Sequence, residues 1–428
     1  MTMPQGPLYN VRVLEFSLIV AAPYLGMNLA DLGADVIKVE PLEGEPRRNS
    51  GTVPGTSRLY QWVNRGKRSI QVDLKAPEGL ALIHRMVKDI DVVAINYRPG
   101  VPKRLGIDYA TLSKINSRLI YAQITGFGSE GPMSGDGGAD VSAQAYSGAM
   151  AANGKVDEHG APEPLGGVVL GDASSGLGGA MGVCAALYHR EKTGEGQYIE
   201  TSLVGAAMAI EGMTPMRDGE TDRTSRARIL ERYAEVRAAG GSYSDLMNAR
   251  KEGAAPRRGS NYWGGYKASD GALAISANTI GGRLKVRQVL GLEGKGTDDP
   301  AIDPIAPDFP ELVRAERAEM EGILRTRTVK EWIVDFRAAE APVAPVLLPE
   351  EVADDEQGKY YFQDLVHSVT GPEKQVKPIV SFSRTPSFIR GPADMPGEHV
   401  DEILHEFNMT NEEIATLRAK KALNPRPE

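Results

Sequence analysis

The first half of the chain alternates short β-branched runs with longer stretches in which apolar residues have helical spacing. VRVLEF (11–16) and ADVIKVE (34–40) have the composition of strands, and AAPYLGMNLADLG lies between them. Further strand-like runs follow in SIQVDL, DVVAIN and RLIYAQITGFG, with the helical PEGLALIHRMVKD between the first two. This βαβ rhythm predicts a parallel sheet covered by helices, in a Rossmann-like α/β domain.

From Gly126 to Gly171 the sequence is rich in Gly, Ser and Pro, which predicts loops over the sheet edge where open α/β folds bind ligands. ASSGLGGAMGVCAALYHREKTG then predicts a helix that ends at Gly194, and GQYIETSL predicts a returning strand. The glycines at 176–182 are interpreted as sites of close helix packing. The turn after VRVLEF lacks the glycines of a dinucleotide site, so we do not expect NAD binding.

The middle of the chain has a different composition. Residues 215–257 are charged, helix-prone and interrupted by Gly, which indicates a connecting arm. A second, smaller α/β segment follows, from YKASDGALAISA to EWIVDFRAAEAPVAPVLL. The tail contains several Pro and Gly residues before a final helix, NEEIATLRAK.

Composition limits the classes of function. The 428 residues are 41% hydrophobic and carry a formal net charge of −8, which suits two domains and argues against a general nucleic-acid binder. Cys184 is the only cysteine, so no intrachain disulfide and no multi-cysteine metal site is expected. The N-terminus does not have the order of a signal peptide, and no apolar run approaches a membrane span of about 20 residues. We therefore expect a cytoplasmic protein without a membrane partner.

Several longer motifs, taken in order, resemble the class III, or CaiB/BaiF-type, CoA-transferases, a family that also contains acyl-CoA racemases. The motifs include LADLGADVIKVEPLEG, NRGKRSIQVDLKAPEG, NYRPGVPKRLGIDYATL, RLIYAQITGFGSEGP and GDASSGLGGAMGVCAALYHREKTGEGQYIETSL. The resemblance spans most of the chain. It implies transfer of coenzyme A from an acyl-CoA thioester to a carboxylic acid, with CoA as a substrate, no metal and no permanently bound cofactor.

The resemblance places the nucleophile of this reaction at Asp172, in LGDASSG. A carboxylate with an ordinary pKa of about 3.9 is anionic at neutral pH, and it attacks a thioester carbonyl without a base, which implies a covalent aspartyl intermediate. From the local sequence alone, Asp172 is also a suitable N-cap for the helix that follows. The two roles are compatible, because a helix N-terminus stabilises negative charge.

For CoA itself, the resemblance implies contacts from VDLK, NYRPG, KRLGID and the first βα turn. The candidate residues are Ile19, Ala21, Val72, Lys75, Asn96, Tyr97 and Arg104. Lys75 and Arg104 have the charge to neutralise phosphates, and Tyr97 has a ring to support adenine. Candidates for a lid or for substrate contact are Asp140, Tyr262, Trp263, Gly264 and Gly265. A tight turn before a strand is the simpler interpretation of the two glycines.

The alternative within the family is an acyl-CoA racemase or isomerase that uses Asp172 in proton transfer. Racemases of this family carry a His before the Asp of a GHD-like motif, whereas this chain has Ala139 before Asp140. Ala cannot transfer a proton, so the usual pair is missing. His84 and His189 are expected on helix surfaces. A third alternative is a noncatalytic CoA-binding protein, which the retained Asp172 disfavours.

The resemblance also implies how the chain is organised. We expect a large CoA-binding and catalytic domain from residues 1–214 and 341–428, the connecting arm at 215–257, and a small α/β domain at 258–340. Relatives form interlocked homodimers, and a charged arm suits the connector of such a dimer. The expected partners are therefore acyl-CoA, a carboxylic acid and a second copy of the chain.

Overall fold

The structure, a computed structural model, describes residues 5–253 and 257–424; residues 254–256 of the predicted arm lie outside the described residues. The chain divides into two compact units. The large unit contains the residues up to Arg217 and those from Tyr360 onward, and the small unit extends from Asp218 to Lys359. These bounds differ from the domain limits expected from the sequence, and the roles assigned to the domains stay predictions.

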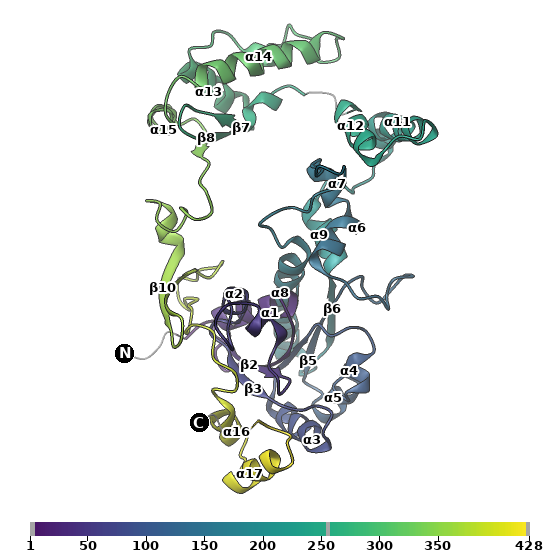
Figure 1. Cartoon of the computed structure of the whole chain (residues 1–428), viewed down its shortest axis with the longest axis vertical. Coiled ribbons are helices and arrows are strands. Elements are labelled where there is room, and N and C mark those ends of the chain that lie inside the picture. Colours follow the sequence, from purple (N-terminus) through teal and green to yellow (C-terminus); the bar gives the residue numbers. More distant parts are fainter. Residues whose placement is uncertain (1–4, 254–256, 425–428) are drawn as a thin grey trace. The chain divides into compact units, whose positions relative to one another are not determined.

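A six-stranded parallel sheet forms the centre of the large unit (Figure 1). In order across the sheet its strands are β3 (Arg68–Gln71), β2 (Asp35–Glu40), β1 (Arg12–Phe16), β4 (Val92–Ile95), β5 (Ile120–Thr125) and β6 (Tyr198–Ser202). The predicted Rossmann-like parallel sheet is therefore confirmed. The strand order reverses between β1 and β4, so the loops after these strands diverge and leave a crevice at their carboxyl ends.

Side chains alternate along the strands, which gives the sheet two apolar faces. Leu14 and Phe16 belong to one buried cluster, whereas Val13 belongs to the other. The first face is covered by α3 (Pro77–Met86), η2 (Val87–Asp89), α5 (Tyr109–Ile115), α16 (Val400–Glu406) and α17 (Asn411–Ala419). The second face is covered by α1 (Ala21–Asp31), α6 (Asp140–Ser147), α8 (Leu170–Thr193) and α9 (Leu203–Glu211).

Helices α1 and α8 approach closely because α8 has glycines where the two helices touch. A Cβ on Gly176 would lie 2.7 Å from the carbonyl oxygen of Ala21, and a Cβ on Gly179 would lie 2.5 Å from a methyl carbon of Leu25. Both distances are too short for a side chain, so the packing interpretation of these glycines is confirmed. This contact lies one turn beyond Asp172, and it holds the start of α8 beside the loop that follows β1.

The rest of the large unit surrounds this sheet. Its remaining elements are η1 (Pro46–Asn49), α2 (Arg58–Asn64), α4 (Val101–Arg104), α7 (Ala149–Asn153) and the antiparallel hairpin of β10 (Phe362–His367) and β11 (Gly371–Val376), while η6 (Gly358–Tyr361) crosses the boundary between the units. The prediction of loops throughout the segment from Gly126 to Gly171 is wrong in part, because α6 and α7 form there. Helix α8 ends at Gly194 in a left-handed conformation, as predicted.

The small unit has its own core and a three-stranded antiparallel sheet of β7 (Trp263–Lys267), β8 (Ala272–Ser276) and β9 (Val343–Pro345). Its other elements are α10 (Gly219–Thr221), η3 (Asp222–Arg226), α11 (Ala227–Ala238), α12 (Tyr243–Gly253), η4 (Ser260–Tyr262), α13 (Ile280–Leu290), η5 (Gly296–Asp298), α14 (Phe309–Leu324) and α15 (Val329–Ala338). Gly264 and Gly265 lie inside β7, so the prediction of a tight turn at these glycines is wrong.

Candidate functional site

Asp172 lines a cavity of about 850 Å³ at the carboxyl edge of the six-stranded sheet. The walls come from the loops after β1, β2, β4 and β5, from α2, and from the starts of α8 and α9. Of the residues that the sequence analysis proposed, the cavity brings together Asp172, Asp140, Ile19, Ala21, Asn96 and Tyr97. Residues that lie far apart in the sequence therefore meet at the crevice where the strand order reverses.

The carboxyl group of Asp172 belongs to the first turn of α8. Among the described residues, no cation pairs with it and no side chain donates a hydrogen bond to it. Burial and the neighbouring negative charge of Asp140 raise the pKa of Asp172 to about 6. At neutral pH the group is still mostly anionic, and it is more basic than an exposed aspartate, which favours nucleophilic attack.

Asp140, at the start of α6, satisfies the free backbone donors of α8. Its Oδ1 accepts hydrogen bonds from the N–H groups of Gly171 at 2.7 Å and Asp172 at 3.1 Å. Its Oδ2 accepts a third from the side chain of Gln144 at 2.6 Å. The prediction that Asp172 is the N-cap is therefore wrong: the position is held by Val169, which makes no side-chain capping bond, and a carboxylate from another helix replaces it. Asp172 is left free for a ligand.

The loop after β1 is strained where it lines the cavity. Ile19 has a φ of 69°, a left-handed value that a β-branched residue rarely adopts. Its N–H donates to Glu45 Oε1 at 2.7 Å. The Asn96 side chain accepts from the N–H of Leu18 at 2.9 Å and donates to its carbonyl at 2.8 Å. The Asn96 amide is therefore already engaged, and it orients the loop.

A cluster of buried charged side chains holds the loop after β1 through Glu45. Lys38 is fully buried, and its ammonium lies 3.1 Å from Glu45 Oε2, 3.3 Å from Glu15 Oε1 and 2.8 Å from Ser17 Oγ. Burial alone would lower the pKa of Lys38, but the carboxylates of Glu45 and Glu15 outweigh it and raise that pKa. Lys67 contacts Glu15 from the other side, at 2.8 Å. Glu45 thus joins a buried cation to the backbone of Ile19.

Three predicted CoA contacts do not line the cavity of Asp172, namely Val72, Lys75 and Arg104. Val72 is 1% exposed and its N–H donates to the carbonyl of Glu40, so this backbone donor is not available to adenine. Lys75 precedes α3, Arg104 ends α4, and both side chains are exposed. Their contact with CoA stays a prediction.

Two arginines that the sequence analysis did not single out line the cavity, Arg47 after β2 and Arg98 after β4. Both side chains are exposed, and neither guanidinium has an ion pair within residues 5–253 and 257–424. Cations at the mouth of a cavity attract phosphates and carboxylates. Arg98 follows Tyr97 in the NYRPG motif, so the sequence could have identified it as a candidate CoA contact. Arg47 lies in no such motif, and only the fold brings it to the same cavity.

The remaining candidates belong to the small unit. Tyr262 is buried there, and its hydroxyl donates to Glu316 Oε1 at 3.1 Å and accepts from Arg287 at 3.0 Å. Trp263 is 64% exposed at the start of β7. Tyr262 therefore has a clear structural role within its own unit. A lid or substrate role for Trp263 and the two glycines after it stays a prediction.

No histidine is among the described residues that line the cavity. The position before Asp140 is Ala139, the N-cap of α6. His84 is half-buried and bonds to the carbonyl of Gly106 at 2.8 Å, so its expected surface position is only partly correct, while His189 is exposed on α8. The proton-transfer partner that a racemase of this kind uses is not at its expected place.

The described residues were also searched for metal sites and membrane spans. They contain no group of three or more His, Cys, Asp or Glu side chains placed to hold a metal ion. In the same parts of the chain, every helix is too short or too polar to cross a membrane.

Comparison with known proteins gives a consistent family. The model of a family described as CoA-transferase family III matches residues 8–400. Succinate–glutarate CoA-transferase of Agrobacterium fabrum is 35% identical over 307 residues, 67% of this chain and 74% of that protein. Human α-methylacyl-CoA racemase is 29% identical over 422 residues, 97% of each chain. A crystal structure of a CaiB/BaiF family protein from Brucella suis matches with a TM-score of 0.71 and 26% identity, covering 94% of this chain and 100% of that one.

Proposed function

Because this chain belongs to CoA-transferase family III, as its motifs predicted, we propose that it moves CoA from an acyl-CoA thioester to a carboxylic acid through a covalent intermediate at Asp172. One observation supports this most: Asp172 is a half-buried carboxylate with a raised pKa and, among the described residues, no hydrogen-bond or ion-pair partner for its side chain, in a cavity that Asn96 and Tyr97 also line. Membership of the family implies CoA as a co-substrate.

The first half-reaction would load CoA onto the enzyme. An Asp172 carboxylate oxygen attacks the thioester carbonyl carbon, the C–S bond breaks, and CoA leaves as a thiolate while a mixed anhydride forms. The thiolate then attacks the aspartyl carbonyl carbon of this anhydride. The donor acid leaves as a carboxylate that retains one oxygen of Asp172, and an aspartyl-CoA thioester remains.

The second half-reaction runs the same steps with the acceptor acid. Its carboxylate attacks the aspartyl-CoA carbonyl, CoA leaves as a thiolate, and a second mixed anhydride forms. The thiolate attacks the acyl carbon of the acceptor, which yields the new acyl-CoA and restores the Asp172 carboxylate. No proton is gained or lost in either half, so the mechanism uses a carboxylate and no acid–base pair.

We propose that CoA lies across the crevice between the loops after β1 and β4. Ile19, Ala21 and Tyr97 would contact it inside the cavity, and Arg98 would meet its phosphates. If the nucleotide extends over α4, Lys75 and Arg104 would pair with the CoA phosphate farthest from Asp172. These assignments rest on the family resemblance and on the lining of the cavity.

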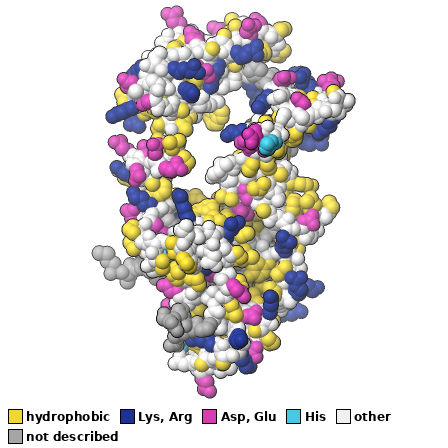
Figure 2. Space-filling model, in the orientation of Figure 1, with side chains coloured by type: hydrophobic (Ala, Val, Ile, Leu, Met, Phe, Trp, Pro, Cys, Tyr) yellow, Lys and Arg dark blue, Asp and Glu magenta, His cyan; other side chains and the backbone are white. Residues whose placement is uncertain are grey.

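We also propose that the chain works as an interlocked homodimer. Large apolar side chains are exposed on α8 and α9 and just beyond, namely Leu177, Met181, Tyr188, Ile210 and Met213. Figure 2 shows hydrophobic side chains in yellow over the surface of the large unit. Leu177, Met181 and Tyr188 are four and seven residues apart, so they lie along one side of α8. A continuous exposed apolar surface is typical of a protein interface, and a second copy of the chain is the expected partner.

Racemisation is the second candidate, and the relative named α-methylacyl-CoA racemase favours it. Isotope labelling separates the two reactions. With an acceptor acid labelled in both carboxylate oxygens by ¹⁸O, transfer leaves ¹⁸O in the side chain of Asp172, and peptide mass spectrometry detects the added mass. Racemisation adds no ¹⁸O and instead exchanges the hydrogen next to the thioester carbonyl with deuterium oxide. Exchange without ¹⁸O in Asp172 would contradict the transfer proposal.

The rate of acyl-enzyme formation should depend on pH through Asp172. Only the deprotonated carboxylate attacks, and the pKa of Asp172 is raised to about 6 by burial and by Asp140. The second-order rate constant of acyl-enzyme formation, from single turnovers at acyl-CoA well below saturation, reports the free enzyme and should therefore rise about tenfold between pH 5 and pH 7 and level off above. Asp140→Asn removes the neighbouring charge and should move the midpoint to lower pH. A midpoint unmoved by this substitution would contradict the assigned cause.

A further inference from the structure

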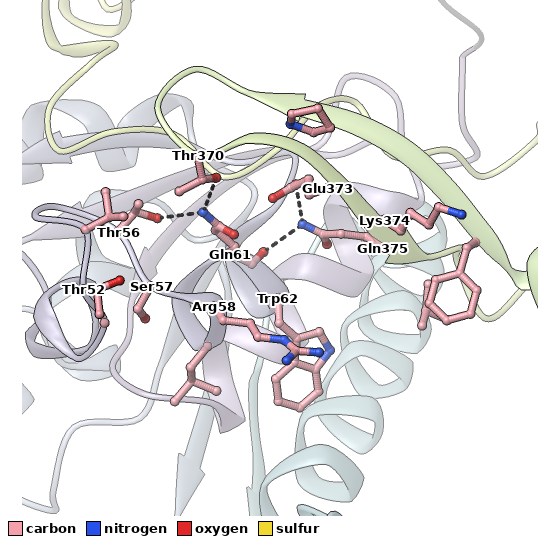
Figure 3. A pocket seen from close by; sticks show the side chains of 16 residues that line it. Thr52, Thr56, Ser57, Arg58, Gln61, Trp62, Thr370, Glu373, Lys374 and Gln375 are labelled. Carbon is pink, nitrogen blue, oxygen red and sulfur yellow. Dashed lines mark hydrogen bonds between the residues drawn. The ribbon is translucent and has the colours of Figure 1, made fainter. Parts of the chain in front are cut away.

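A second cavity, of about 1070 Å³, lies on the far side of α2 from Asp172, between this helix and the β10–β11 hairpin. Figure 3 shows Arg58, Gln61 and Trp62 on α2, facing the strand that carries Glu373, Lys374 and Gln375. The cavity belongs wholly to the large unit. None of the steps proposed above uses it.

The two cavities have a common wall. Leu59 and Trp62 line both the cavity of Asp172 and the cavity beside the hairpin. They are three residues apart on α2, so they are neighbours along one side of the helix. Trp62 also packs against Tyr24 of α1, with ring centroids 5.6 Å apart. A ligand that passes these two side chains would extend from Asp172 into the second cavity.

The proposed CoA site forms another part of the wall of the Asp172 cavity. A third cavity, of about 700 Å³, adjoins it there and shares Arg98, Asp136 and Gly137 with it. The sulfur of a thioester must lie at Asp172, because that is where the C–S bond breaks. The thioester sulfur separates CoA from the acyl group. If CoA contacts Tyr97 and Arg98, the acyl group therefore extends in the other direction, toward Leu59 and Trp62.

The lining of the hairpin cavity indicates what kind of acyl group it holds. Its amide side chains are already paired: Gln61 donates to Thr56 at 3.3 Å and Thr370 at 3.0 Å, and Gln375 donates to Glu373 at 2.8 Å. Val53, Phe362 and Val376 add apolar surface. Arg58, by contrast, has no hydrogen bond or ion pair to its guanidinium in the described parts of the chain. Lys374 is a second cation of the lining, and the one carboxylate there among the described residues, on Glu373, accepts from Gln375. An anionic group at the end of an apolar chain matches this lining.

We infer that the cavity between α2 and the β10–β11 hairpin is the acyl subsite, and that it takes acids with a second carboxylate, which pairs with Arg58. This inference rests on the proposed function. Leu59 and Trp62 then separate the reacting carbonyl from the distal carboxylate, and Arg58 selects diacids over monoacids. A guanidinium suits this task because it binds a carboxylate through two parallel hydrogen bonds.

The test compares two thioesters of equal chain length, glutaryl-CoA and pentanoyl-CoA. Formation of the Asp172 adduct is followed by quenched-flow mass spectrometry, and kcat/KM is obtained for each thioester. We expect the wild type to prefer glutaryl-CoA. Arg58→Gln should lower kcat/KM for glutaryl-CoA about 10- to 100-fold and change that for pentanoyl-CoA less than about twofold. Arg58→Lys keeps the charge and should recover part of the preference.

The matched control is Arg85→Gln, on α3, whose half-exposed guanidinium pairs with Glu413, donates to the carbonyl of Asn408, and lines none of the three cavities. It should leave both values unchanged. Adducts from both thioesters, with the same ratio in wild type and Arg58→Gln, would overturn the acyl subsite and leave the proposed function intact. No adduct at Asp172 from any acyl-CoA would overturn the proposed function and the subsite with it.

Discussion

Replacing Asp172 with Asn is expected to lower the rate of CoA transfer by more than about 10⁴-fold, because the amide cannot form the anhydride on which both half-reactions depend. Acyl-CoA binding should change little, since the proposed CoA contacts remain in place. Steady-state assays with purified enzyme measure the first effect, and equilibrium titration with a nonhydrolysable CoA thioether measures the second. Activity within about tenfold of the wild type would exclude Asp172 as the nucleophile.

The same substitution is expected to make the protein more stable at neutral pH. The pKa of Asp172 is about 6 in the folded protein, against an ordinary value of 3.8, so the folded state binds this proton more tightly than the unfolded chain. Ionisation of Asp172 therefore costs stability as pH rises from about 4 to 6, and the full cost, about 1–3 kcal/mol, is present above that range. Asn removes it.

Urea unfolding at several pH values measures this gain. The advantage of Asp172→Asn over the wild type should be largest above about pH 6 and should disappear below about pH 4, where the wild-type carboxyl group is protonated in both states. Asp364→Asn, an exposed position on β10, is the matched control and should show no such trend. A gain that is independent of pH would contradict the electrostatic cause.

Lys38→Met is expected to destabilise the large unit by about 3–5 kcal/mol, because it leaves the buried carboxylate of Glu45 without its ion-pair partner. Lys38 is fully buried and contacts Glu45 at 3.1 Å and Glu15 at 3.3 Å. Lys67 still pairs with Glu15 in the variant, whereas Glu45 loses the only ion pair that it makes among the described residues. The midpoint of chemical unfolding reports the loss.

Two further variants make this prediction specific. Glu45→Gln removes the unpaired charge, and the double variant Lys38→Met/Glu45→Gln should therefore recover part of the lost stability. Lys420→Met removes an exposed lysine of the same type, which pairs with Glu78 at the surface, and should shift the midpoint little. A loss in Lys420→Met as large as that in Lys38→Met would show that burial of the pair is not the cause.

The order of strands and helices in the large unit follows closely from the sequence. β-branched runs predict β1 to β5, and the small residues of α8 predict its contact with α1 because only hydrogen fits between the helices at Gly176. The helices between Gly126 and Gly171 were harder to predict. Its high content of Gly and Ser hides α6 and α7, whose stability comes from packing against their neighbours and not from local propensity.

The candidate site was only partly predictable, for a physical reason. Asp172 lies in a motif, but the groups that set its pKa and orient its surroundings act through contacts over long sequence separations. Asp140 caps α8 from another helix, and Glu45 bonds to Ile19 from the loop after β2. Neither contact leaves a pattern in the local sequence. Arg47 and Arg58, which have no ion pair within the described residues, likewise become candidates only when the fold places them beside cavities.

The most direct test of a covalent aspartyl mechanism is the mass of the protein after incubation with a panel of acyl-CoA thioesters and hydroxylamine. Wild type should carry a hydroxamate at Asp172, located by peptide mapping, and Asp172→Ala should carry none. Because hydroxylamine also cleaves acyl-CoA thioesters directly, the CoA released beside Asp172→Ala is the blank, and the additional release with wild type should at least equal the hydroxamate formed on Asp172. An Asp172 that stays unmodified under conditions where the wild type transfers CoA between two acids would contradict the account.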